Sequence, residues 1–251
     1  MFDVAAQSYD RFMGRFSKQL SAPLCDLAGV RDGDRALDVG AGPGALTGEL
    51  VRRLGADHVA AVDPSEPFTA AIADRHPGVD VWRAGAEELP FRDDAFDVAL
   101  AQLVVAFLTD PARGVAEMAR VTRAGGRVAL CSWDYAGWRA PVSPYWRAVR
   151  AGGDGPGEDD LVGGRLEHLV ELLTGAGLTG VRTAELTSEV VSDDFADWWE
   201  PFTLGVGPAG AHCAGLAGDE RDRVREACRA ELGDGPVTVR AVAWAAVADV
   251  P

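Results

Sequence analysis

The stretch Ala36–Thr47 reads ALDVGAGPGALT and decides the fold of this chain. A short apolar run over 35–39, predicted to be a strand, leads into three glycines, and a helix-length stretch over 45–54 follows them. Glycines at such a junction let the backbone turn sharply and let a ligand come close to the main chain. In an open α/β sheet the junction lies at the carboxyl end of a strand, where ligands bind. The stretch therefore predicts a ligand site, and a glycine-rich turn that binds nothing is the alternative.

Short apolar runs alternate with helix-length stretches around this loop. Strands are predicted over 35–39, 58–62, 79–83, 96–101 and 127–133, and helices over 45–54, 65–76 and 111–123. This alternation is typical of βαβ units, so we expect an α/β fold with a Rossmann-like, doubly wound, mostly parallel sheet. Two later strands, 181–191 and 237–247, follow a helix over 165–174. They bring the expected sheet to seven strands, the last of them antiparallel.

The second half of the chain differs from the first in composition and in the spacing of its predicted elements. Residues 151–164, AGGDGPGEDDLVGG, are rich in glycine and acid and predict a flexible surface loop or a short disordered link. The long gap between the last two strands predicts a small helical insert over 192–235. The insert is expected to contain helices over 194–204 and 219–232. We expect the whole chain, 1–251, to form a single domain.

Composition narrows the classes of function. The chain has 251 residues, of which 47% are hydrophobic and 25% charged, as in an ordinary globular protein. Its 39 acidic residues outnumber 24 Lys and Arg and give a net charge of −15, which disfavours nucleic acid and anionic membrane surfaces as partners. We expect no secretory signal and no membrane span. The four cysteines are scattered without metal-ligand spacing, so a cytoplasmic protein without disulfides or a metal site is expected.

Two carboxylates near the glycine loop indicate which ligand it holds. Asp63 ends the second strand about 20 residues after Gly40, where nucleotide-binding sheets place an acid that binds ribose hydroxyls, although Asp63 could also cap the next helix. Asp38 stands two residues before Gly40 and would repel the pyrophosphate of a dinucleotide. The same charge would attract a sulfonium or an ammonium, and S-adenosylmethionine carries both. Electrostatics therefore favour this methyl donor over a nicotinamide cofactor.

Three further segments make a family resemblance specific. Together with the glycine loop, VDPSEPF (62–68), GAEELPFRDDAFDVAL (85–100) and AEMARVTRAGGRVAL (116–130) resemble successive motifs of the class I S-adenosylmethionine-dependent methyltransferases. The sequence is most similar to the small-molecule group that includes the ubiquinone/menaquinone-biosynthesis methyltransferases. The resemblance covers roughly residues 1–133, and the rest of the chain follows the family only in the order of its strands and helices.

The resemblance implies a donor site at the carboxyl ends of the first four strands, made by Asp38, Gly40, Gly42, Asp63, Pro64, Ala86, Glu87 and Gln102. The first three of these would line the methionine part of the donor, and Asp63 would bind its ribose. Pro64 would lie against the adenine, whose edge Ala86 and Glu87 would contact. Gln102 would close the site.

The sequence departs from the family pattern in two places. Gly85 stands where many members carry an aspartate for the adenine amino group, so adenine selectivity would rest on backbone groups or on Glu87. Ala106 stands where relatives commonly have a histidine, so no histidine base is carried over to that position.

Aromatic residues near the start of the chain recur at helical spacing and predict helical structure within residues 1–30. This helix could simply cap the sheet. By the resemblance it would act as a lid, with Tyr9 covering the donor and Arg15 available to the donor carboxylate.

Aromatic residues also gather after the fifth strand, where they could form the walls of an apolar acceptor pocket or merely pack the insert onto the sheet. The candidate substrate-binding residues are Trp133, Tyr145, Trp198, Trp199 and His212. The sequence contains no recognisable catalytic set of Ser, His and Asp and no recognisable catalytic pair of carboxylates. The catalytic residue therefore stays unassigned, and we expect no indispensable general base.

The sequence thus predicts an enzyme that uses S-adenosylmethionine to methylate a small, aromatic or otherwise apolar molecule at oxygen, nitrogen or carbon. Two alternatives stay open, which are an NAD-type oxidoreductase on the same sheet and a donor-binding protein without catalysis. The sequence does not indicate the acceptor or the oligomeric state.

Overall fold

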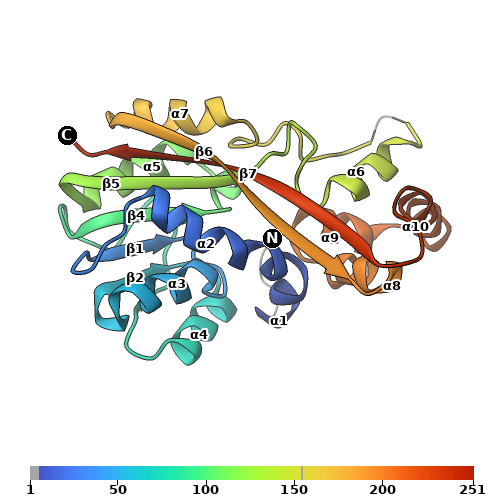
Figure 1. Cartoon of the computed structure of the whole chain (residues 1–251), viewed down its shortest axis with the longest axis horizontal. Coiled ribbons are helices and arrows are strands. Elements are labelled where there is room, and N and C mark those ends of the chain that lie inside the picture. Colours follow the sequence, from blue (N-terminus) through green and yellow to red (C-terminus); the bar gives the residue numbers. More distant parts are fainter. Residues whose placement is uncertain (1–5, 154) are drawn as a thin grey trace.

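The computed structural model describes residues 6–153 and 155–251, which contain a seven-stranded sheet in the order β3-β2-β1-β4-β5-β7-β6 (Figure 1). The strands are β1 (Ala36–Val39), β2 (Val59–Val62), β3 (Asp80–Trp82), β4 (Phe96–Gln102), β5 (Thr122–Trp133), β6 (Thr179–Ser192) and β7 (Val237–Asp249). Strands β1 to β5 are parallel, and β7 is antiparallel to β5 and β6. The predicted mostly parallel sheet with an antiparallel last strand is confirmed.

Helices cover both faces of this sheet. One face carries α2 (Arg15–Leu27), α3 (Ala45–Leu54) and α4 (Glu66–Arg75), and the other carries α5 (Pro111–Val121) and α7 (Leu166–Gly175). Successive side chains of a strand point to opposite faces, so a strand between two helical layers must be apolar on both. Along β4, Val98 and Leu100 pack toward α2 and α3, whereas Ala99 and Ala101 pack toward α5 and α7. The doubly wound arrangement follows from this burial.

Short elements complete the first half of the chain. Before α2 lie α1 (Ala6–Tyr9) and the π-helical turn η1 (Asp10–Gly14), and two single 3-10 turns are η2 (Ala56–His58) and η3 (Val105–Phe107). The aromatic side chains of Phe12 and Phe16 are buried in the core cluster of the α2 face. The helical structure expected near the start of the chain is therefore present and packs on the sheet.

Four short helices connect β6 to β7 and gather with α6 (Ser143–Arg150) where these two long strands extend past the rest of the sheet (Figure 1). They are α8 (Phe195–Trp199), η4 (Glu200–Leu204), α9 (Gly207–Gly215) and α10 (Gly218–Leu232). The single helix predicted over 194–204 is wrong, because the chain changes from α to 3-10 geometry at Glu200. Pro201 explains the break, since proline has no backbone N–H and its ring clashes with the preceding turn.

The glycine-rich segment predicted to be a flexible surface loop is, in its described part, folded against the sheet. Ala136 donates a backbone hydrogen bond to Gly164 at 3.1 Å, and Arg150 binds the Asp159 carboxylate at 2.5 Å. A β-carbon at Gly163 would lie 3.1 Å from the Ser132 hydroxyl, so this glycine allows a close approach to β5. The helix before the segment, α6, was not predicted from sequence. Together these contacts place the segment at the carboxyl end of β5.

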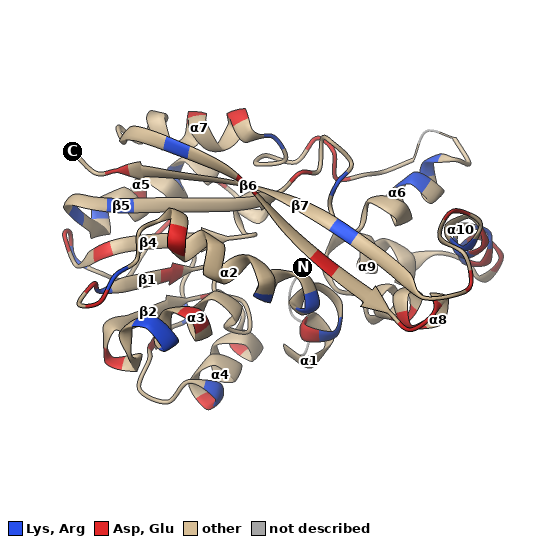
Figure 2. Cartoon of the chain, viewed as in Figure 1, with Lys and Arg blue, Asp and Glu red and all other residues tan. Residues whose placement is uncertain are grey.

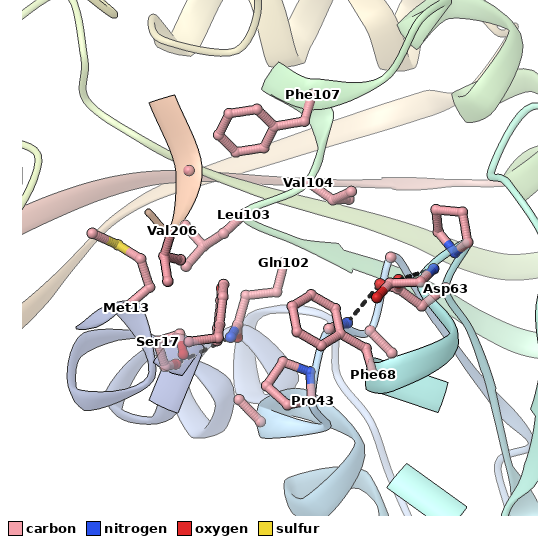
Figure 3. Close-up of a pocket in the computed structure, with 18 of the residues that line it drawn as sticks. Met13, Ser17, Pro43, Asp63, Phe68, Gln102, Leu103, Val104, Phe107 and Val206 are labelled. Carbon is pink, nitrogen blue, oxygen red and sulfur yellow. Dashed lines mark hydrogen bonds between the residues drawn. The ribbon is translucent and has the colours of Figure 1, made fainter. Parts of the chain in front are cut away.

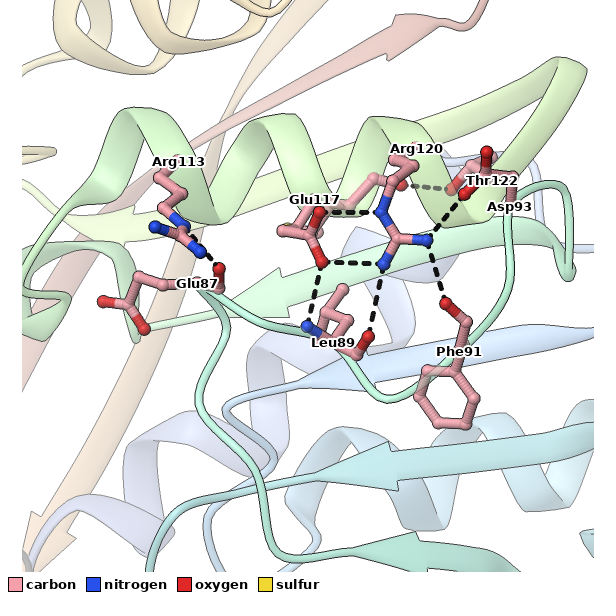
Figure 4. Close-up of polar contacts among 9 residues, drawn as sticks. Glu87, Leu89, Phe91, Asp93, Arg113, Glu117, Arg120 and Thr122 are labelled. Carbon is pink, nitrogen blue, oxygen red and sulfur yellow. Dashed lines mark hydrogen bonds and ion pairs between the residues drawn. The ribbon is translucent and has the colours of Figure 1, made fainter.

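The connection from β3 to β4 contains no helix, and one arginine of α5 fixes it instead (Figure 4). Arg120 donates to the backbone oxygens of Leu89 and Phe91 at 3.2 and 2.9 Å. Its guanidinium also pairs with Asp93 and Glu117, each at 2.7 Å. Several hydrogen bonds from one planar group hold a loop in a defined position. This loop carries the predicted donor-site residues Ala86 and Glu87.

Charged side chains lie mainly on the helices and loops, and acidic and basic residues are interspersed along α10 (Figure 2). None of the helices within 6–153 and 155–251 has both the length and the apolar composition needed to cross a membrane. The four cysteines are buried as free thiols.

Candidate active site

A cavity of about 980 Å³ lies at the carboxyl ends of the parallel strands (Figure 3). It is of the size typical of small-molecule sites. The predicted residues that line it are Tyr9, Asp38, Gly40, Gly42, Asp63, Pro64, Ala86, Glu87, Gln102 and Trp133. The fold thus brings the residues of the predicted donor site into one space.

The glycine loop between β1 and α3 presents its main chain to this cavity. Gly40, Gly42 and Gly44 all have positive φ, at 66°, 55° and 94°, a region that side chains disfavour. The amides of Gly40 and Ala41 donate to the Val62 oxygen at 2.9 and 3.0 Å, which ties the loop to β2. Gly40 also packs directly against the Val104 side chain. A side chain at this position would push the loop toward the space that a ligand needs.

Asp63 fixes the same loop from the end of β2. Its Oδ2 accepts from the Gly42 amide at 2.9 Å and its Oδ1 accepts from the Ser65 amide at 2.8 Å (Figure 3). Burial raises the pKa of this carboxyl, and the two amide hydrogen bonds oppose that rise. A carboxylate has about four acceptor positions, so lone pairs remain for two ribose hydroxyls. The cap-like contact at Ser65 and a ribose-binding role are therefore compatible.

Asp38 lies beneath the loop and is only 1% exposed. The Thr47 hydroxyl donates to its Oδ2 at 2.6 Å. Burial raises the pKa of Asp38 to about 7, and the nearby charge of Asp63 adds to the rise, while the Thr47 hydrogen bond opposes it. A cation bound beside this group would favour its ionised form. The site is therefore suited to a ligand that carries positive charge.

We expect the affinity for S-adenosylmethionine to fall as the pH drops below about 7. A cation binds best when Asp38 is ionised, so up to about tenfold in affinity should be lost per pH unit below its pKa. In the ligand-free protein the raised pKa has the opposite effect, because stability falls as the pH rises toward 7 and the buried acid ionises. Calorimetric titration across this range tests the expectation. Asp38→Asn should bind the donor weakly at every pH, and an unchanged slope in that variant would contradict the assignment.

The loop after β3 closes the cavity on the side of Glu87. The Glu87 carboxylate accepts from the backbone amides of Thr109 and Asp110 at 2.9 and 3.3 Å. The Glu87 backbone oxygen accepts from Arg113 at 2.7 Å (Figure 4). A β-carbon at Gly85 would lie 3.1 Å from the Glu87 carboxylate. Glu87 therefore occupies the space beside the glycine that replaces the expected aspartate.

Two buried polar atoms at the cavity wall have no hydrogen-bond partner among the described residues. They are the Gln102 Oε1 and the Ser17 hydroxyl, although the Gln102 amide nitrogen does donate to the Ser17 backbone oxygen at 3.0 Å (Figure 3). Leaving such atoms unpaired costs about 1–3 kcal/mol each, and a ligand with polar groups would satisfy them. Their chemistry fits the ammonium and carboxylate of an amino acid.

Five predicted residues do not line the cavity, namely Arg15, Tyr145, Trp198, Trp199 and His212. Arg15 instead donates to the Val191 backbone oxygen at 3.1 Å and pairs with Asp197 at 3.3 Å, away from the donor loop. The Tyr145 hydroxyl binds the His212 ring at 2.6 Å, and Tyr145 packs against Trp199. The His212 ring packs against Trp146. The geometry therefore places these aromatic rings in the core between α6, α8 and α9, which was the alternative interpretation of their clustering.

The far end of the cavity contains residues that sequence reasoning missed. Met13 and Val206 lie there, with Gln102 and Leu103 between them and Asp63 (Figure 3). Tyr135, Val142 and Glu158 also line the cavity. Glu158 comes from the glycine-rich segment, where neither periodicity nor a motif singles it out. His168, the remaining histidine considered as a base, accepts from the Gly163 amide at 3.2 Å instead.

Comparison with known proteins agrees with this geometry. A family model described as "Methyltransferase domain" matches residues 37–130. An uncharacterized protein of Mycobacterium tuberculosis is 31% identical over 196 residues, which are 72% of this chain and 68% of the relative. A demethylmenaquinone methyltransferase of Paenarthrobacter aurescens is 31% identical over 152 residues, which are 59% of this chain and 57% of that protein.

A solved structure extends the likeness to nearly the whole chain. The phosphoethanolamine N-methyltransferase 2 of Haemonchus contortus, solved with S-adenosylhomocysteine, superimposes with a TM-score of 0.61. It covers 98% of this chain and 57% of that protein at 15% identity, so it shows a shared fold. No group of three or more His, Cys, Asp or Glu within the described ranges is arranged to hold a metal ion. The chain belongs to the class I S-adenosylmethionine-dependent methyltransferases.

Proposed function

We propose that this methyltransferase acts on a small apolar acceptor that is neutral or cationic. The observation that carries the proposal is the lining of the cavity beyond the glycine loop. There the side chains of Met13, Val142 and Val206 and the rings of Trp133 and Tyr135 form a predominantly apolar surface. Such a surface favours an apolar ligand by the area that it removes from water.

The charges around the cavity decide which acceptors it can accept. The lining contains the carboxylates of Asp38, Asp63, Glu66, Glu87 and Glu158. The cation among the described lining residues, Arg83, is already bound to the Glu66 carboxylate at 2.8 Å and to the Pro64 oxygen at 3.1 Å. An anionic acceptor would lose hydration without gaining a free cationic partner. We therefore expect amines, phenols or neutral rings to be accepted, and carboxylates or phosphates to be rejected.

The chain itself would position the donor and exclude water. Asp63 would hold the ribose, the main chain of residues 40–42 would line the methionine part, and Gln102 would pair with its polar end. S-adenosylmethionine supplies a methyl group bound to a positively charged sulfur. Alignment in a dry cavity accounts for much of the acceleration of such a direct displacement.

The test is a turnover screen with S-adenosylmethionine labelled in its methyl group. The probes are para-cresol, indole and benzylamine, with para-toluate as an anionic control of similar shape. We expect label to be transferred to at least one of the first three and not to para-toluate. Faster methylation of para-toluate than of all three would contradict the proposed acceptor class.

The remaining expectations concern the cellular compartment of the enzyme and the class of its acceptor. We propose a cytoplasmic enzyme, which is supported by four buried free thiols, and a small molecule rather than nucleic acid as the acceptor, which is supported by the net charge of −15. The family assignment favours methyl transfer over the NAD-type oxidoreductase and over a protein that binds the donor without catalysis.

A further inference from the structure

One carboxyl group in the cavity lies outside the predicted donor site. Glu158 lines the cavity and is only 5% exposed. Its Oε2 accepts a hydrogen bond from the Trp146 indole N–H at 2.7 Å. Buried carboxylates are costly unless each oxygen is satisfied, and this neutral donor satisfies one oxygen only. The fold therefore keeps a carboxyl group at the apolar end of the cavity with acceptor capacity to spare.

The surroundings of Glu158 give it the properties of a proton acceptor near neutral pH. Burial raises its pKa to about 7, and the Trp146 hydrogen bond opposes the rise. The titratable groups around it are few within the described residues. The Tyr135 phenol lies close enough for Glu158 to raise the pKa of the phenol. His212 packs against Trp146, with ring centroids 5.1 Å apart. Its chain neighbour Asp159 is bound to Arg150 at 2.5 Å.

The position of Glu158 links it to the donor end of the cavity. Trp133 ends β5, whose residue Cys131 pairs in register with Gln102 at the end of β4. Tyr135 follows Trp133, and it lies close enough to both Tyr9 and Glu158 for their charges to raise its pKa. Tyr9 in turn lies close enough to Asp38 and Asp63 for the same effect. Tyr9, Tyr135 and Glu158 line the cavity with the two aspartates, so polar groups continue from the donor loop to Glu158 along an otherwise apolar wall.

We propose that Glu158 is a catalytic residue that binds the O–H or N–H of the acceptor and takes its proton, which restricts the acceptor to hydroxyl and amine nucleophiles. This inference rests on the proposed function, and it departs from the expectation from sequence that no general base is indispensable. The lone pair of the acceptor oxygen or nitrogen forms the new bond to the methyl carbon, and the electron pair of the broken carbon–sulfur bond stays on sulfur. The proton of the acceptor passes to the Glu158 carboxylate, which later releases it to solvent.

The first test compares Glu158→Gln with Asp160→Asn, using para-cresol and benzylamine at saturating donor. Gln keeps an oxygen for the Trp146 N–H, so Glu158→Gln should fold, but it cannot take a proton. We expect its kcat to fall by about 10²–10⁴-fold and the rise of kcat through pH 7 to disappear. Asp160→Asn, a matched change at an exposed residue of the same segment that does not line the cavity, should leave both unchanged. Saturation with donor removes the separate effect of Asp38 on donor affinity.

A second readout needs no turnover. Infrared difference spectra of the S-adenosylhomocysteine complex, recorded below and above pH 7, should show a protonated carboxyl band that is lost in Glu158→Gln and kept in Asp160→Asn. A wild-type kcat or pH profile in Glu158→Gln, or a spectrum identical to wild type, overturns the inference while the acceptor class stands. If wild type methylates neither para-cresol nor benzylamine, the proposed acceptor class fails, and the infrared spectra still decide the protonation of Glu158.

Discussion

Replacing Gly40 with alanine is expected to lower the free energy of unfolding by about 2–5 kcal/mol and to abolish measurable donor binding. Alanine in the left-handed region costs about 1–2 kcal/mol, and Gly40 has a φ of 66°. Its β-carbon would also lie within 2.9 Å of three atoms of the Val104 side chain. Overpacking of this kind costs about 1–3 kcal/mol. Thermal and urea denaturation measure the stability loss, and calorimetry measures donor binding.

Gly42→Ala is the matched control for this effect. Gly42 also has a positive φ, at 55°, but a β-carbon there meets nothing within 4 Å. It should therefore lose only the backbone contribution of about 1–2 kcal/mol. Equal losses in the two variants would show that close packing of the loop on Val104 is not what Gly40 provides.

Asp63→Asn is expected to weaken donor binding by about 1.5–3 kcal/mol, or about 10–150-fold. The amide loses the charge that strengthens contacts with ribose hydroxyls. It also has one oxygen where the carboxylate has two, although Gly42 and Ser65 each donate to a separate oxygen of Asp63. One of these backbone N–H groups would then face an NH₂ group, and the loop would lose part of its support.

The control for this variant is Asp194→Asn at the start of α8. Asp194 also accepts a backbone hydrogen bond, from Asp197 at 2.9 Å, but it does not line the cavity. Its donor affinity should equal that of wild type. Calorimetric titration of S-adenosylhomocysteine into the three proteins decides the point, and wild-type affinity in Asp63→Asn would place the ribose elsewhere.

The parts of the fold that could be predicted from sequence are those with local signals. The apolar run of β4 predicts a strand that is buried on both faces, and the glycines of the glycine loop predict its turn. The break at Glu200 was missed because Pro201 interrupts a pattern that otherwise has helical periodicity. Helix α6 was missed because its aromatic residues were interpreted as pocket walls rather than as the buried face of a helix.

Some residues of the candidate site could also be predicted from sequence, and others could not. Asp38 and Asp63 stand next to strand ends, and in a parallel sheet these ends meet at one edge, so their proximity follows from the sequence. Glu158 reaches the cavity only because the segment around Gly163 packs on β5, a contact between distant parts of the chain. The aromatic residues of the insert show the opposite case, since composition alone cannot tell a pocket wall from a packed core.

The most direct test of the donor site is the melting temperature of the protein with and without ligand. A ligand that binds only the folded state raises the melting temperature in proportion to the logarithm of its concentration over Kd. We expect S-adenosylhomocysteine to raise it, and NAD and NADP at the same concentration to leave it unchanged. A rise with NAD or NADP and none with S-adenosylhomocysteine would contradict the account of the cavity as a methyl-donor site.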